Sequence, residues 1–255
     1  MTDLPARPDL AARLRQLTPA RVALGRVGVG LPTRPMLDFE LAHARARDAV
    51  HAELGDGAFG ATMAGLPVIA VQSQAPDRAT YLRRPDLGRR LDPASAERLS
   101  PAGADLAIVI ADGLSAAAVL AHGAAIVAAI LARMSDWSVS PIVVAHQARV
   151  AIGDEIGAAL GARLAIVLIG ERPGLSAADS VGAYLTWGPR PGRRDSERNC
   201  VSNIRPGGLA IDRAAALIAA IAEGARDLGE TGVRLKIAEP SLALGQDGIE
   251  LIRSS

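Results

Sequence analysis

The sequence predicts an α/β fold in which a parallel β-sheet carries helices on both faces. The first observation is a set of three continuous apolar runs, at residues 106–111 (LAIVIA), 141–145 (PIVVA) and 164–169 (LAIVLI). Runs that are apolar without alternation are typical of strands covered on both faces. The second observation is that segments with helical patterns separate these runs, at the spacing of strand–helix–strand units. We therefore expect a Rossmann-like sheet with right-handed crossovers.

The part of the chain that follows residue 100 contains the regular elements. Ser115 is placed to cap a long apolar helix over residues 114–134, because a serine hydroxyl accepts hydrogen bonds from the free N–H groups at a helix start. The other predicted elements are a turn at 146–150, a helix at 154–160, strands at 183–187 and 233–237, and an amphipathic helix at 209–228.

The first hundred residues are predicted to form a helical and irregular appendage. We therefore divide the chain into this appendage, residues 1–100, and a Rossmann-like domain, residues 101–255. The predicted parts of the appendage are a short helix at 9–17, a cap and first-turn proline at 18–19, a glycine-rich loop at 21–35, a helix at 36–54, a β-like run at 66–71 and an arginine-rich segment at 77–99.

The apolar segment 114–134 is long enough to suggest a membrane span. It is mostly alanine, however, and it contains His122 and Gly123 and begins beside Asp112. We interpret it as a buried helix of an α/β protein.

Composition excludes several classes of protein. The formal net charge is +1 and aromatic residues make up 2% of the 255-residue chain, which argues against a nucleic-acid-binding surface. One cysteine rules out an internal disulfide and a cysteine-based zinc cage. Charges near the N-terminus occupy the place where a signal peptide needs an apolar core, so we expect a cytoplasmic protein.

Familiar catalytic motifs are missing from the sequence. It contains no GxSxG, HExxH, Walker loop or CxxC, and its GRVGVG follows no strong strand, as a dinucleotide-binding turn would require. The four histidines are scattered. His146, just past a predicted strand, is the one candidate acid or base, although a structural role is the simpler interpretation.

Polar and small side chains follow the three predicted strands at the edge where open α/β sheets bind ligands. One set follows the strand 164–169, where Glu171 and Arg172 are either ligand contacts or a local ion pair. The loop 199–203 is expected to fold over the same edge, and it includes Cys200, for which an inert core position is the alternative. The other candidates at this edge are Asp112, Ser115, Arg149 and Val150.

Several motifs make the chain resemble the light (small) subunit of ethanolamine ammonia-lyase. The most specific is the pair GERPGL and RNCVSNIR within residues 170–205. The resemblance covers roughly residues 21–236. The supporting motifs are YLRRPDLGRRL at 81–91, DLAIVIADGLS at 105–115, ARVAIGDEIGAALGA at 148–162 and the glycine-rich segment that begins GRVGVGLPTRP at residue 25.

This resemblance implies an adenosylcobalamin-dependent lyase that converts ethanolamine to acetaldehyde and ammonia by a radical mechanism. It implies a large TIM-barrel subunit as partner, with the cofactor between the subunits and the substrate contacts mainly on the large one. The family's cobalamin contacts correspond to Val150, Glu171 and Cys200, all at the edge predicted from the strand ends. The domain 101–255 is then expected to bind cobalamin, with no catalytic residue of its own.

Two other functions stay open at this point. One is a free-standing Rossmann-like enzyme with a nucleotide cofactor, and the other is a purely structural subunit whose edge loops only make contacts. Relatives packaged in bacterial microcompartments can carry an N-terminal extension, and only about twenty residues precede Arg21 here. We therefore expect cytoplasm, with a microcompartment as the alternative.

Overall fold

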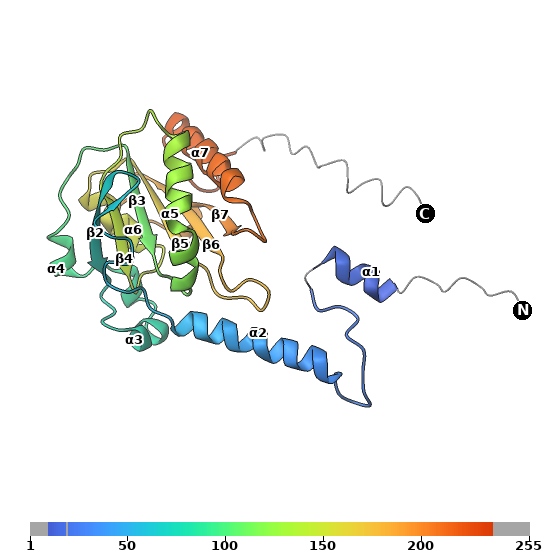
Figure 1. The fold of residues 1–255 in the computed structure, drawn as a ribbon. Helices are drawn as coiled ribbons and strands as arrows, with labels where there is room; N and C mark the ends of the chain where they lie inside the picture. The colour runs from blue at the N-terminus through green and yellow to red at the C-terminus, as the bar shows by residue number, and fades with distance from the viewer. Residues whose placement is uncertain (1–9, 19, 237–255) are drawn as a thin grey trace, which may run out of the picture.

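A mixed β-sheet forms the centre of the computed structural model, which describes residues 10–18 and 20–236 (Figure 1). The strands lie in the order β1-β2-β4-β3-β5-β6-β7. Their bounds are β1 Thr62–Met63, β2 Leu66–Gln72, β3 Leu106–Ala111, β4 Ile142–His146, β5 Leu164–Gly170, β6 Val181–Trp187 and β7 Asn199–Ile204.

Helices lie on both sides of this sheet and in an N-terminal arm. The α-helices are α1 Leu10–Leu17, α2 Thr33–His51, α3 Arg78–Arg83, α4 Pro93–Ala96, α5 Ala116–Arg133, α6 Ile152–Ala159 and α7 Ile211–Leu228. Short 3-10 turns, η1 Leu87–Arg89 and η2 Asp195–Glu197, lie in the connections. The predicted α/β class with helices on both faces is confirmed.

The centre of the sheet is parallel and contains the three predicted apolar strands. Strand β3 pairs with β4 on one side, where Val109 lies opposite Val143, and with β5 on the other, where Val109 lies opposite Val167. Helix α5 connects β3 to β4, and α6 connects β4 to β5 across β3. From β3 the chain moves to β4 on one side and then back across β3 to β5 on the other side. Because both crossovers are right-handed and run in opposite directions along the sheet, α5 and α6 lie on opposite faces.

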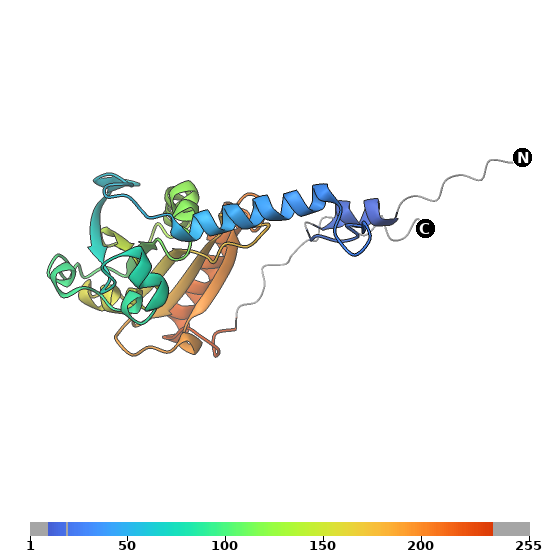
Figure 2. The ribbon, with the colours of Figure 1, turned by 90° about the horizontal axis from the view of Figure 1, so that it is seen from below.

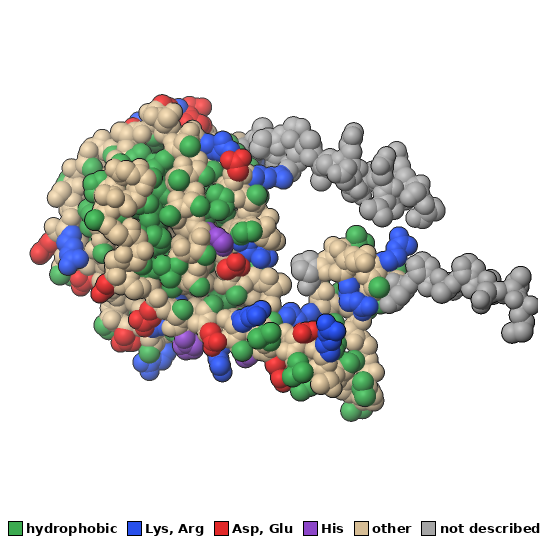
Figure 3. Space-filling model, viewed as in Figure 1, with side chains coloured by type: hydrophobic (Ala, Val, Ile, Leu, Met, Phe, Trp, Pro, Cys, Tyr) green, Lys and Arg blue, Asp and Glu red, His purple; other side chains and the backbone are tan. Residues whose placement is uncertain are grey.

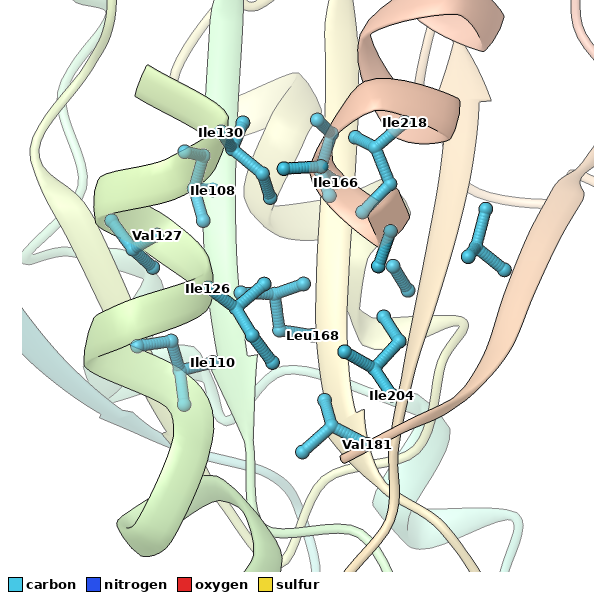
Figure 4. Close-up of a cluster of buried hydrophobic side chains, with 14 of the residues drawn as sticks. Ile108, Ile110, Ile126, Val127, Ile130, Ile166, Leu168, Val181, Ile204 and Ile218 are labelled. Atoms are coloured by element: carbon cyan, nitrogen blue, oxygen red, sulfur yellow. The ribbon is translucent and has the colours of Figure 1, made fainter. Parts of the chain in front are cut away.

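Alternate residues of the central strands enter two separate cores. In β3, Ile108 and Ile110 lie beside α5 (Figure 4) and share one core with Leu106, whereas the smaller Ala107 and Val109 belong to the second core, which contains residues of α6. Every residue of β3 and β5 is buried. Their two-sided burial explains why these strands read as continuous apolar runs.

The expectation of a wholly parallel sheet is wrong at its edges. Strand β6 is antiparallel to β5 and β7 is antiparallel to β6. Ten residues, 171–180, join β5 to β6 without a helix, and a parallel pairing needs a crossover of about a dozen or more residues. The short connection therefore returns the chain as a hairpin.

The predicted last strand, 233–237, is also wrong over its described residues. The N–H of Val233 donates to the Ser196 carbonyl at 3.2 Å, and that of Leu235 returns to the Gly232 carbonyl at 3.1 Å. These bonds fold the segment into a turn beside the loop before β7. Residue 237 lies outside the described residues.

The β-like run 66–71 is a full strand of the sheet, because β2 pairs in parallel with β4. Residues before position 100 thus contribute to the central sheet. The division of the chain into residues 1–100 and 101–255 stays a prediction.

Helix α2 extends away from the sheet as an arm (Figures 1 and 2). It contains no buried residue. Large apolar side chains are exposed on it and in the loop before it, as the space-filling view shows (Figure 3). They are Val27, Val29, Leu31, Met36, Leu37, Phe39 and Leu41. The predicted cap at 18–19 includes residue 19, which lies outside the described residues.

Helix α5 is, within the described ranges, the one helix long and apolar enough to span a membrane. Its buried residues, which include Ile126 and Ile130, pack on the sheet beside α7. Ser115 caps it as predicted, because its hydroxyl accepts from the N–H of Ala118 at 3.3 Å. Packing on the sheet supports the interpretation of α5 as a core helix.

A test of the central packing is the substitution Gly170→Ala at the end of β5. A Cβ at Gly170 would overlap the carbonyl oxygen of Ser115, so the variant is expected to lose about 1–3 kcal/mol of unfolding free energy in urea. Gly55→Ala is the control, because a Cβ there meets nothing within 4 Å, and it should stay within about 0.5 kcal/mol. Equal stabilities of the two variants would contradict the close packing.

Candidate functional site

A cavity of about 670 Å³ lies at the carboxyl edge of the parallel strands. This volume falls in the range of small-molecule sites. Its walls come from the turns after β3, β4 and β5, where the chain reverses direction and open α/β sheets bind ligands. The lining residues are Leu82, Pro85, Arg89, Gly113, Leu114, Arg149, Val150, Ala151, Ile169, Gly170, Arg172, Tyr184, Asp195, Arg198 and Cys200.

The floor of the cavity depends on the contact between the turn after β3 and the end of β5. The N–H of Leu114 donates to the Gly170 carbonyl at 2.9 Å. Gly113 has a φ of +56°, and a Cβ on it would overlap that same carbonyl. Glycine is therefore required at position 113 for both its left-handed backbone and its close approach.

The buried Asp112 holds the turn after β4. Its carboxylate accepts from the N–H groups of Gln147 at 2.8 Å and Ala148 at 2.9 Å. Gln147 has a φ of +52°, a strained conformation that these bonds help to hold. Burial raises the pKa of Asp112, against the opposing effect of the two N–H donors and of Arg78. Asp112 thus positions the turn that carries Arg149 and Val150 without lining the cavity itself.

Tyr81 of α3 packs against the same turn, which follows β4. Its ring is buried between two guanidinium groups, with the Cζ of Arg78 4.8 Å and that of Arg149 4.5 Å from the ring centroid. Its hydroxyl donates to the Ala148 carbonyl at 3.1 Å, and burial raises the pKa of this hydroxyl. Arg78 in turn donates to the carbonyls of Gly113 at 2.9 Å and Val50 at 2.8 Å. The turns after β3 and β4 are therefore tied together through α3.

A buried ion pair forms the wall between α6 and the segment before β7. Two nitrogens of Arg198 donate to the two carboxylate oxygens of Asp154 at 2.6 and 2.7 Å. One of them also donates to the hydroxyl of Thr186 at 2.8 Å. Arg198 is thereby fixed at the cavity with its charge compensated.

Tyr184 and Cys200 lie opposite each other on β6 and β7, so the prediction of a loop at 199–203 is wrong. Desolvation raises the pKa of the Cys200 thiol, and desolvation together with Cys200 raises the pKa of Tyr184 to about 12. Both groups are therefore neutral at physiological pH. The residue Cys200 as a whole is exposed, so the alternative of an inert core position is wrong, although its neighbours partly desolvate the thiol.

The structure brings two of the three predicted cofactor contacts together on the cavity. Val150 and Cys200 both line it. Glu171 does not, although its neighbours Gly170 and Arg172 do. Its carboxylate accepts from the N–H of Asn203 at 3.1 Å and thus joins the end of β5 to β7.

Other predicted edge residues take different places. Arg149 lines the cavity as expected, whereas the hydroxyl of Ser115 donates to the Ala178 carbonyl at 2.9 Å. His146 is half-buried at the end of β4 and is not a lining residue.

Sequence reasoning missed Tyr81, Tyr184 and Arg198. Their burial and partners depend on contacts between distant segments, such as that of Arg198 with Asp154. One hint was present in the sequence, the cluster of arginines in the segment 77–99. From this segment Arg89 lines the cavity, and Arg78 holds the turn after β3 through its bond to the Gly113 carbonyl.

The lining suits the binding of a ligand rich in oxygen acceptors. It combines apolar surface with four arginines and one carboxylate, that of Asp195. It includes no histidine, and the described part of the chain has no group of three or more His, Cys, Asp or Glu side chains arranged for a metal ion. The arrangement can hold and orient a large polar molecule.

Comparison with known proteins gives a consistent result. Residues 8–236 match the sequence profile of the ethanolamine ammonia-lyase light chain. The chain is 55% identical over 230 residues to the ethanolamine ammonia-lyase small subunit of Rhodopseudomonas palustris, with 88% of each chain covered. It is 56% identical over 243 residues to that of Bradyrhizobium diazoefficiens, with 91% of this chain and 92% of the relative covered.

The raised pKa of Cys200 predicts slow alkylation. Because Cys200 is the single cysteine, mass spectrometry after iodoacetamide treatment reports on it alone. We expect a pH midpoint of the reaction above the usual cysteine pKa of about 8.5, and slower modification at pH 8 than in the urea-unfolded chain. A folded chain that reacts as fast as the unfolded one at pH 8 would show that the thiol is not desolvated.

Proposed function

The chain belongs to the ethanolamine ammonia-lyase small-subunit family, a family of carbon–nitrogen lyases, and we propose that it works with a large catalytic subunit and adenosylcobalamin. In this proposal the complex converts ethanolamine to acetaldehyde and ammonia by a radical mechanism. The small subunit contributes cofactor binding, and the large subunit contributes the substrate contacts.

The cavity at the reversal point of the sheet is the observation that carries this proposal. Val150 and Cys200 were expected to contact the cofactor, and they come from the turn after β4 and from β7, about fifty residues apart in the sequence. The lining includes no paired acid and base among the described side chains. A cofactor-holding half-site accounts for both properties.

The residues present fit a corrinoid. Val150 and Ile169 offer apolar contact to a large ring, and Cys200 is small and neutral, so it permits a close approach. Arg149 and Arg198 each have a buried Nε that lacks a hydrogen-bond partner within the described structure, as expected of a site whose acceptors come from a ligand. When bound, adenosylcobalamin supplies the radical chemistry, and the protein supplies orientation and shielding.

Glu171 is best explained as a residue that joins two walls of this half-site. Its bond to the N–H of Asn203 fixes the strand that carries Cys200. Asn203 has a φ of +58°, a left-handed conformation that asparagine tolerates better than most residues, and the bond from its N–H to Glu171 helps to hold it. We keep a direct hydrogen bond between Glu171 and the amide side chains of the cofactor as part of the proposal.

The exposed apolar arm supports a partner subunit. Contiguous apolar surface on a folded chain typically marks an interaction site. The arm between residues 27 and 41 has such surface, and the relatives are named small subunits. We place the complex in the cytoplasm, with a bacterial microcompartment as the alternative.

The central test is reconstitution. The purified chain alone is expected to deaminate no ethanolamine, whereas co-expression with its large subunit should give an active complex with bound cobalamin, seen by its visible spectrum. A complex denied cobalamin is the control. Full turnover by the isolated chain would overturn the proposal, and saturable binding of NAD to it would favour the nucleotide-cofactor alternative.

Glu171 offers a second test. Glu171→Ala removes the acceptor for the Asn203 N–H, so the assembled complex is expected to bind hydroxocobalamin roughly tenfold more weakly, whereas Glu171→Gln keeps an acceptor and should stay within about threefold. Titration followed by visible absorbance measures both. Unchanged affinity of the alanine variant would favour a purely structural role for this edge.

A further inference from the structure

We propose that Arg149 donates hydrogen bonds to an oxygen acceptor of the bound corrinoid, and that Tyr81 is the positioning residue that holds its guanidinium toward the cavity. The inference rests on the proposed function and specifies one donor of the half-site. It distinguishes Arg149 from the other arginines that line the same cavity.

The partners of the cavity arginines differ. Arg198 is compensated by Asp154, with two hydrogen bonds of 2.6 and 2.7 Å, so that among the described residues only its Nε lacks a hydrogen-bond partner. Arg89 lies 3.6 Å from the carboxylate of Asp195, and Arg172 is exposed on the rim. The side chain of Arg149 contacts the face of Tyr81, and across the described residues its Nε is buried without a hydrogen-bond partner. Arg149 is therefore the half-buried cation that best suits a ligand.

Arg149 is held in place before any ligand arrives. Its backbone N–H donates to the Gly88 carbonyl at 2.7 Å. Its guanidinium lies over the Tyr81 ring, which also contacts the guanidinium of Arg78. A Cβ on Gly88 would be 2.8 Å from the Tyr81 ring, so this ring has little room to move. A donor fixed in this way loses little conformational entropy on binding.

The chemistry of a guanidinium defines the acceptor. It is planar, stays charged and donates in pairs to phosphate or carbonyl oxygens. Cobalamin carries both types, one anionic phosphodiester in its nucleotide loop and several neutral amide side chains. The shared feature is an oxygen acceptor, and cobinamide separates the two sources because it lacks the phosphodiester and the nucleotide base.

The test compares dissociation constants for hydroxocobalamin and cobinamide in the complex with the large subunit, measured by visible absorbance titration. Arg149→Gln is expected to weaken hydroxocobalamin binding roughly ten- to a hundredfold, the scale of a hydrogen bond to a charged group. Arg83→Gln is the matched control, because Arg83 is exposed on α3 and is not a lining residue. It should leave both constants unchanged.

The pattern across probes and variants decides the inference. If Arg149→Gln loses affinity for hydroxocobalamin but not for cobinamide, the acceptor is the phosphodiester. If it loses affinity for both probes, the acceptor is an amide carbonyl. Tyr81→Phe keeps the ring contact with Arg149 and removes only the hydroxyl bond to Ala148, so it should retain more affinity than Tyr81→Leu, which should reproduce part of the affinity loss of Arg149→Gln. Arg149→Lys keeps the charge without the planar fork and should bind at an intermediate level. Thermal unfolding checks that each complex is folded.

Wild-type affinity of Arg149→Gln for both probes would overturn the inference and leave the proposed function standing. A wild-type complex that binds no corrinoid would overturn both.

Discussion

The packing of the turn after β3 on the end of β5 is the constraint on which the site depends. Gly113 and Gly170 let two backbones approach where any side chain would overlap a carbonyl. This close approach places the turn after β3 against the end of β5, and the cavity lies beside this contact. The bonds from Asp112 to the turn after β4 then add the third wall.

The charged groups around the cavity are divided between structure and binding. Arg78 and Arg198 are used for structure, because each is buried and bonded to groups of the protein itself. Arg78 and Arg198 each keep one unpartnered nitrogen as well, but the side chain of Arg149 has a ring contact and no hydrogen bond or ion pair within the described residues, and we assign it to the ligand. Buried cations are costly unless they are compensated, so this division explains how one wall can contain several arginines.

The large subunit and cofactor expected from the resemblance are consistent with the surface of the folded chain. The cavity is open, the chain contributes one half of its proposed walls, and the arm containing α2 exposes apolar side chains. In the proposed function, the chemistry belongs to a cofactor held between chains. A cavity whose described lining includes no histidine suits that arrangement.

The sequence by itself determined the apolar strands, their helical connections, the cap at Ser115 and the sheet edge that carries Val150, because burial on two faces and turn chemistry are local signals. Cys200 reaches the same edge through the pairing of β7 with β6. Only the tertiary structure decided that β6 and β7 run antiparallel, that Glu171 turns to β7 and that Tyr81 lies beneath Arg149. Those outcomes depend on contacts between segments far apart in the chain, and neither composition nor periodicity records such contacts.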